Sequence, residues 1–71
     1  MNSDPVKLLI NGEERETSQA VNVSELITEL GLPGPAILVE HNGTALRREE
    51  WLGRPLATGD RLEIIRIVAG G

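Results

Sequence analysis

A single apolar stripe with helical spacing constrains this chain more than any other feature. The stripe follows the i, i+3, i+4, i+7 pattern of a helix that buries one face, and it consists of Val23, Leu26, Ile27 and Leu30. Asn22 stands at the N-cap position with Glu25 three residues later, as in a capping box. Gly31 is placed to close the helix in the left-handed conformation, and Pro33 prevents its continuation. The sequence therefore predicts one short helix that packs by a single face.

Segments with strand character lie on both sides of this helix. Residues 6–10 alternate in hydrophobicity, the Asn-Gly pair at 11–12 is a two-residue turn signal, and residues 13–17 return as a polar second strand. Residues 37–41 predict a third strand whose Glu40 faces solvent, because a buried carboxylate would lack a partner. That phase turns Ile37 and Val39 inward.

The C-terminal third of the chain reads as a connection and a last strand. The Asn-Gly pair at 42–43 is another turn signal, and Leu46 begins a polar connection. We interpret residues 47–50 of this connection as a solvated loop and Trp51 as a residue that closes the core. Gly59-Asp60 is the last turn, and a final strand starts at Arg61.

This order of elements predicts an α+β fold with one domain over residues 1–71. We expect a mixed sheet of four to five strands, with one main helix packed on one face. The first and last strands are the most apolar, so they belong at the centre of the sheet. Phe and Tyr are absent, so the core is built from Leu, Ile and Val.

A lone helix leaves the other face of the sheet without cover. If Leu62 and Ile64 point toward the helix, Ile65 and Ile67 point away from it. The predicted apolar patch on this outer face consists of Leu9, Leu38, Ile65 and Ile67. Because a contiguous exposed patch usually marks an interaction site, we interpret it as a partner-binding surface.

Composition excludes several classes of function. The chain has no cysteine and one histidine, which argues against thiolate catalysis and a histidine- or cysteine-built metal site. The net charge is −4 and the seven Lys and Arg are scattered, unlike a nucleic-acid-binding surface. No apolar stretch approaches the roughly 20 residues that span a bilayer, and we expect a cytoplasmic protein. We interpret His41 as a strand-end residue without a partner rather than a catalyst.

The sequence ends in two glycines, directly after the apolar run of the last strand. Glycine accepts almost any backbone conformation and presents no side chain to a narrow channel. The tail of residues 68–71 could therefore enter another protein's active site, where the carboxylate of Gly71 would react. The alternative interpretation is a frayed terminus.

Three segments together resemble ThiS-type sulfur-carrier proteins. The Asn-Gly turn followed by arginine and tryptophan lies in residues 39–51, the Gly-Asp turn in residues 58–64, and the terminal signature in residues 68–71. The similarity runs from about Val6 to the end and leaves residues 1–5 as a flexible extension. The resemblance implies a ubiquitin-like β-grasp fold and a role in making the thiazole ring of thiamine.

The resemblance also implies partners, because the carrier is a protein co-substrate and not an enzyme. A ThiF-like adenylyltransferase would use ATP and Mg to activate the carboxylate of Gly71, and no cofactor is expected on the chain itself. Sulfur derived from cysteine, delivered for example by a cysteine desulfurase, would convert it to a thiocarboxylate for a ThiG-like thiazole synthase. Gly70, Ala69 and Val68 would thread into the partner.

Other functions fit part of these observations. The chain could carry sulfur for molybdopterin or cysteine synthesis, or act as a ubiquitin-like protein tag. A different class is a β-grasp interaction module whose terminus is never activated. Two positions depart from the ThiS pattern: His41 stands where an apolar residue is more usual, and Arg47 where proline is common.

Overall fold

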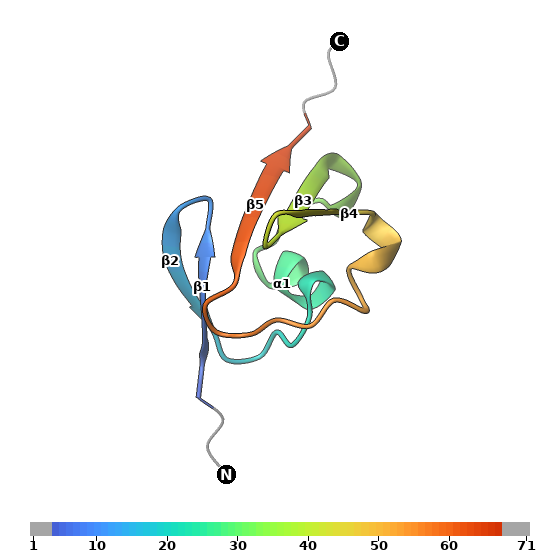
Figure 1. Cartoon of the computed structure of the whole chain (residues 1–71). Helices are drawn as coiled ribbons and strands as arrows, with labels where there is room; N and C mark the ends of the chain where they lie inside the picture. Colours follow the sequence, from blue (N-terminus) through green and yellow to red (C-terminus); the bar gives the residue numbers. More distant parts are fainter. Residues whose placement is uncertain (1–3, 68–71) are drawn as a thin grey trace.

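The computed structural model describes residues 4–67 as a five-stranded sheet with one α-helix (Figure 1). The elements, in chain order, are β1 (Val6–Ile10), β2 (Glu13–Thr17), α1 (Val23–Glu29), a 3₁₀ turn (Gly34–Ala36), β3 (Ile37–His41), β4 (Thr44–Leu46), a second 3₁₀ turn (Arg48–Glu50) and β5 (Arg61–Arg66). The strands lie in the order β2-β1-β5-β3-β4. The pair β1–β5 is parallel and the other three pairs are antiparallel. The expected mixed sheet, with the first and last strands inside it, is confirmed.

Two Asn-Gly pairs form the two tight turns of the sheet. The turn between β1 and β2 has φ 52° at Asn11 and 82° at Gly12, and the turn between β3 and β4 has φ 50° at Asn42 and 85° at Gly43. Hairpins favour this left-handed pair because it matches the right-handed twist of the flanking strands. Asn and Gly are the residues that tolerate such angles best, so both predicted turns are confirmed.

The helix begins where the sequence predicts. The Asn22 side chain accepts a hydrogen bond from the Glu25 backbone N–H at 2.8 Å. The Glu25 carboxylate accepts from the N–H of Val21 at 2.9 Å, one residue before the N-cap, so the reciprocal half of the capping box is shifted by one position. Gly31 has φ 70° just beyond the C-cap Leu30, as expected for the helix end.

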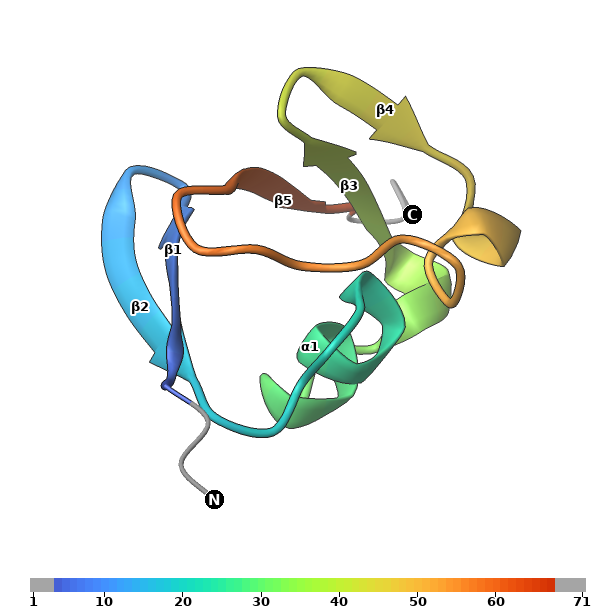
Figure 2. The same cartoon turned by 60° about the horizontal axis from the view of Figure 1, so that its bottom comes forward.

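The core lies between α1 and one face of the sheet. Figure 2 shows the helix and the connection after β4 on that side. The buried apolar side chains are Leu8, Ile10, Ala20, Val23, Leu26, Ile27, Ile37, Val39, Leu46, Trp51 and Leu62. Trp51 is buried as expected, although its indole N–H finds no hydrogen-bond partner within residues 4–67. In that part of the chain no helix covers the opposite face, which we call the outer face.

One prediction about the connection is wrong. Leu46 does not begin the polar connection, because residues Thr44–Leu46 pair with β3 as a fifth strand. Leu46 lies opposite Val39 and is buried with it. Three residues without an apolar alternation gave no strand signal of their own. The predicted tail at 68–71 lies outside the described residues, as do residues 1–3 of the predicted extension.

Candidate functional site

An apolar patch lies on the outer face, at the end of β5. Leu38 and Ile65 are directly opposite each other in the β3–β5 pair, and each is 54% exposed. Ile67 follows two residues later and is 47% exposed. The alternation of side chains along β5 places Ile65 and Ile67 on the same face, away from the helix. The predicted phase of the last strand is thus confirmed, and these three residues form what we call the outer patch.

Leu9 does not belong to this patch, so the prediction of a four-residue patch needs correction. It is half-buried and pairs with Arg61, four residues before Ile65 on β5. Glu63 and its partner Glu40 occupy the outer face between these two positions. Leu9 has the predicted orientation but the wrong position along β5, since the pattern of a strand gives its phase and not its register.

The outer patch adjoins the tail in sequence. The backbone N–H of Ile67 donates to the carbonyl of Ala36 at 2.6 Å, which ties the end of the described chain to the segment before β3. The predicted reacting and threading residues come directly after it. They are Val68, Ala69, Gly70 and Gly71, and all four lie outside the described residues.

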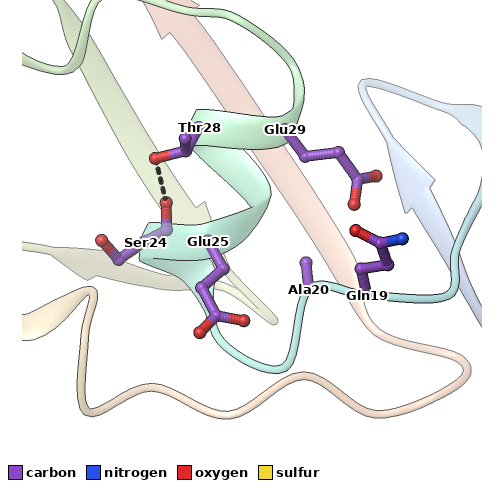
Figure 3. A pocket seen from close by; sticks show the side chains of 6 residues that line it. All are labelled: Gln19, Ala20, Ser24, Glu25, Thr28 and Glu29. Atoms are coloured by element: carbon purple, nitrogen blue, oxygen red, sulfur yellow. Dashed lines mark hydrogen bonds between the residues drawn. The ribbon is translucent and has the colours of Figure 1, made fainter.

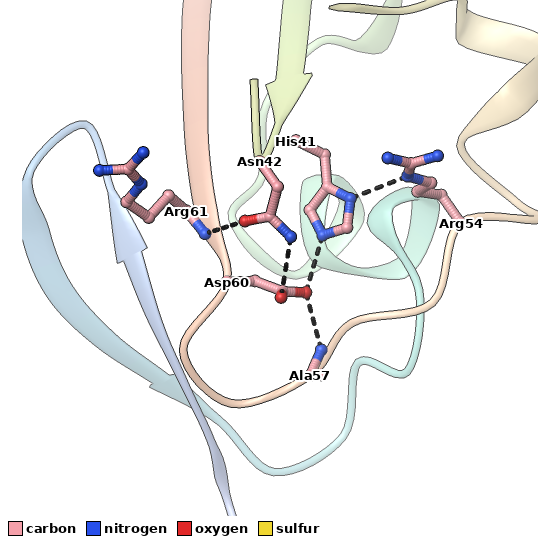
Figure 4. Close-up of polar contacts among 6 residues, drawn as sticks. All are labelled: His41, Asn42, Arg54, Ala57, Asp60 and Arg61. Carbon is pink, nitrogen blue, oxygen red and sulfur yellow. Dashed lines mark hydrogen bonds and ion pairs between the residues drawn. The ribbon is translucent and has the colours of Figure 1, made fainter. Parts of the chain in front are cut away.

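A partly buried polar cluster lies at the other end of β5, around the buried His41 (Figure 4). The His41 ring is 5% exposed, its Nε2 lies 2.7 Å from Oδ2 of Asp60, and its Nδ1 accepts from Nε of Arg54 at 2.8 Å. Because Nδ1 accepts, the proton of the neutral ring is on Nε2 and is donated to Asp60. The expectation that His41 has no partner is therefore wrong. No local signal could have found these partners, which come from residues 13 and 19 positions away.

Asp60 is the centre of this cluster. Burial disfavours its charged form, but hydrogen bonds from His41, from the Asn42 amide at 3.0 Å and from the Ala57 N–H at 2.9 Å outweigh that effect. The pKa of Asp60 is consequently lowered below its ordinary value of 3.8. Asn42 also accepts from the Arg61 N–H at 2.8 Å. The cluster therefore connects the β3–β4 turn to the start of β5, and we assign it a structural role.

The hollow beside α1 offers no comparable chemistry (Figure 3). It is open to solvent, and its carboxylates already have partners. Glu25 accepts from the Val21 N–H, and Glu29 accepts from the Thr17 hydroxyl at 2.7 Å. Across residues 4–67 no group of three or more acidic, histidine or cysteine side chains could hold a metal ion. None of the helices in this part of the chain is long and apolar enough to cross a membrane.

The segment of residues 47–50 is more ordered than a plain solvated loop. The Glu50 carboxylate accepts from the Arg47 N–H at 2.6 Å and closes the second 3₁₀ turn. The Arg48 guanidinium lies against Gly34, where an added Cβ would come within 3.3 Å of it. A Cβ at position 34 would require the exposed Arg48 side chain to shift by a few tenths of an ångström.

Comparisons with known proteins agree with the fold. The ThiS family model matches residues 8–71. A crystal structure of the thiamine biosynthesis protein ThiS from Geobacter metallireducens superposes with a TM-score of 0.80 at 30% identity, over 93% of this chain and 100% of that one. An NMR structure of a thiamine biosynthesis protein from the same organism gives 0.76, also at 30% identity, over 93% and 88% of the two chains.

Two curated relatives match nearly the whole chain. A thiazole synthase from Paramagnetospirillum magneticum is 36% identical over 66 residues, which are 93% of this chain and 20% of that protein. This chain thus spans about a fifth of that relative. The uncharacterized protein ycf40 of Trieres chinensis is 27% identical over 62 residues, which are 87% of this chain and 85% of that protein. With a family match over residues 8–71 and a β-grasp fold shared with solved ThiS structures, the chain belongs to the ThiS family.

Proposed function

We propose that this chain carries sulfur on the carboxyl group of Gly71 and delivers it for formation of the thiazole ring of thiamine. The observation that supports this most directly is the match to the ThiS family, which extends through Gly71. The chain would act as a co-substrate of other enzymes, as the match to the ThiS family suggests.

The proposed chemistry asks little of the carrier itself. A carboxylate is a poor acyl donor, so a ThiF-like adenylyltransferase would first let it attack the α-phosphate of ATP and release pyrophosphate. A hydrosulfide ion would then displace AMP and leave a thiocarboxylate directly. A persulfide would displace AMP to form an acyl disulfide, from which a second thiol would release the thiocarboxylate while itself becoming part of a disulfide. The enzyme would supply Mg and cationic groups that stabilise the phosphate charges. A terminal glycine suits this reaction because no side chain hinders the approach of sulfur.

We place the docking of the adenylyltransferase on the outer patch of Leu38, Ile65 and Ile67. This surface is apolar and exposed, and its last residue, Ile67, directly precedes residues 68–71 in the sequence. A partner that holds it would position the tail for entry into its active site. A few apolar anchors commonly dominate such contacts.

The later partners follow from the same chemistry. A cysteine desulfurase or similar sulfur-delivery enzyme would supply the sulfur, and a ThiG-like thiazole synthase would consume the thiocarboxylate. The 36% identity to part of a thiazole synthase supports the thiazole synthase as a partner, because a segment related to this chain forms part of a protein with that name. We propose that the carrier acts in the cytoplasm.

Intact mass spectrometry tests the proposal. The chain is incubated with the adenylyltransferase, ATP and a sulfur source, and we expect the mass increase for one oxygen replaced by sulfur, confirmed by thiol-selective labelling. Gly71→Val should abolish the product without changing the melting temperature. Gly53→Val is the matched control, because Gly53 has open space for a side chain. Normal activation of the Gly71→Val protein would contradict the proposal.

A second variant separates a carrier from an interaction module. One residue added after Gly71 moves the carboxylate away from the reacting position, so a carrier should lose all activation. A module whose terminus is never activated should bind its partner unchanged and yield no adenylate even in the unmodified chain.

A further inference from the structure

Two glutamates face each other on the outer face beside the outer patch. Glu40 and Glu63 are direct partners in the β3–β5 pair, and both are exposed. Like charges at directly opposite positions destabilise an antiparallel pair. Among residues 4–67 the only acidic and basic side chains within ion-pair distance are Asp60 and His41, so neither glutamate is neutralised within that part of the chain.

An open hollow of about 370 Å³ surrounds this acidic pair. Its lining residues are Leu9, Gly12, Glu40, Gly43, Arg61 and Glu63. Arg61 lines the same hollow but lies beyond ion-pair distance of both carboxylates. Toward β2 the outer face carries three more charged residues. Lys7 lies opposite Glu16, and Glu14 lies opposite Leu9. Within residues 4–67, four glutamates thus outnumber two cationic side chains on this face.

The acidic pair and the outer patch lie in one line along β5. Glu63, Ile65 and Ile67 alternate onto the same face, and a strand rises about 3.3 Å per residue. The acidic pair is therefore about 13 Å from Ile67, toward the start of β5. From Ile67 toward the start of the strand, the outer face presents an apolar surface first and two carboxylates without ion-pair partners second.

We propose that the adenylyltransferase docks on this face by a two-part contact, in which an apolar segment covers Leu38, Ile65 and Ile67 and one arginine or lysine side chain lies between Glu40 and Glu63. This inference rests on the proposed function. Charge complementarity supports it: the fold gains nothing from the opposed carboxylates, whereas a cation between them removes their repulsion. The apolar contact alone could slide along the strand, and the second contact fixes the register in which the tail enters the partner.

A pair of charge-matched variants tests this contact. Glu40→Gln with Glu63→Gln removes both carboxylates and keeps their shape. Glu13→Gln with Glu49→Gln is the control, since it changes the net charge equally at exposed positions away from the outer face. The dissociation constant for the adenylyltransferase is measured at increasing NaCl, together with the melting temperature and adenylate formation at saturating carrier.

The two-part contact predicts opposite effects on binding and stability. The Glu40→Gln/Glu63→Gln protein should bind about tenfold more weakly at low salt, with a flatter salt dependence than the wild type. Its melting temperature should rise by a few degrees, because the repulsion is gone. Adenylate formation at saturating carrier should persist. The control variant should lose only the affinity that follows from its reduced net charge.

Two results would overturn the inference at different levels. Equal affinity and equal salt dependence for the two double variants, with normal adenylation of the wild type, would remove the acidic contact and leave the proposed function intact. A wild-type chain that neither binds the enzyme nor becomes adenylated would overturn the proposed function and the contact together.

Discussion

The two ends of β5 are built for different purposes. At its start, Leu62 is 1% exposed and β5 pairs with β1 on one side and β3 on the other. At its end, Ile65 is half exposed and pairs with β3 alone. The change occurs at Asn11, whose side-chain amide accepts from the Ile64 N–H at 2.8 Å and donates to its carbonyl at 3.1 Å. This amide continues the ladder for one residue after β1 has turned away.

The difference shows how one six-residue strand can hold the domain together and present a surface. The first half supplies buried apolar area and joins the His41–Asp60 cluster, so its residues contribute mainly to folding. The second half keeps backbone pairing to β3 but leaves its outer side chains to solvent. Substitution of the buried Leu62 should change stability, and substitution of the exposed outer-face residues of β5, including Glu63, should change partner binding.

Leu62→Ala should give the largest loss of stability along the strand. The side chain is fully buried against the core, and truncation leaves a cavity, so we expect a loss of about 2–5 kcal/mol in unfolding free energy. Ile65→Ala on the same strand should stay within about 0.5 kcal/mol of wild type. Urea unfolding followed by circular dichroism checks both values, and similar losses for the two variants would contradict the division of β5.

Ile65→Asp should weaken partner binding, whereas Leu62→Ala should weaken folding stability. If Ile65 is a buried anchor in the complex, the charge should weaken adenylyltransferase binding by at least about 2 kcal/mol. Aspartate keeps the acidic character of the face, so the loss reports on apolar contact. Leu52→Asp is the control, because Leu52 is 71% exposed and lies in the connection after the second 3₁₀ turn. Unchanged binding at an unchanged melting temperature would rule Ile65 out as an anchor.

The features of the fold that the sequence predicted are those with a local signal. Alternation gave the phase of Ile65 and Ile67, and the Asn-Gly pairs gave both tight turns, because each signal lies within a few neighbouring residues. The short β4 had no such signal, since its pairing depends on β3. The family resemblance supplied the fold and the chemistry proposed for Gly71, which periodicity alone could not specify.

The features that sequence reasoning missed depend on register between distant segments. Leu9 was assigned to the correct face, but its partner Arg61 is 52 positions away, so its distance from Ile65 could not be read from alternation. His41 was taken to lack a partner because Arg54 and Asp60 are far along the chain. A single sequence contains no measure of which residues on two strands stand opposite each other.

Asp60→Ala should lower the unfolding free energy by less than Leu62→Ala, although both residues lie at the start of β5. The substitution removes the acceptor for the His41 ring, the Asn42 amide and the Ala57 N–H. Asp60 is 14% exposed, so water can replace part of these bonds, and we expect a loss of about 1–2 kcal/mol. Thermal unfolding at neutral pH measures it, with the exposed acid Asp4→Ala as the control. A loss no larger than that of the control would show that the cluster is dispensable.

Acid should weaken the start of β5 by a smaller and graded amount. The pKa of Asp60 is lowered in the folded chain, so its unfolded form binds a proton more readily than its folded form. The stabilisation is therefore fully present well above the ordinary value of 3.8 and is lost as the pH falls through the lower folded pKa. We expect the stability difference between wild type and Asp60→Asn to be constant near neutrality and to shrink below about pH 5. Urea unfolding of both proteins from pH 7 to pH 3 measures this difference, and a difference that stays constant or grows on acidification would contradict the role assigned to the ionised carboxylate.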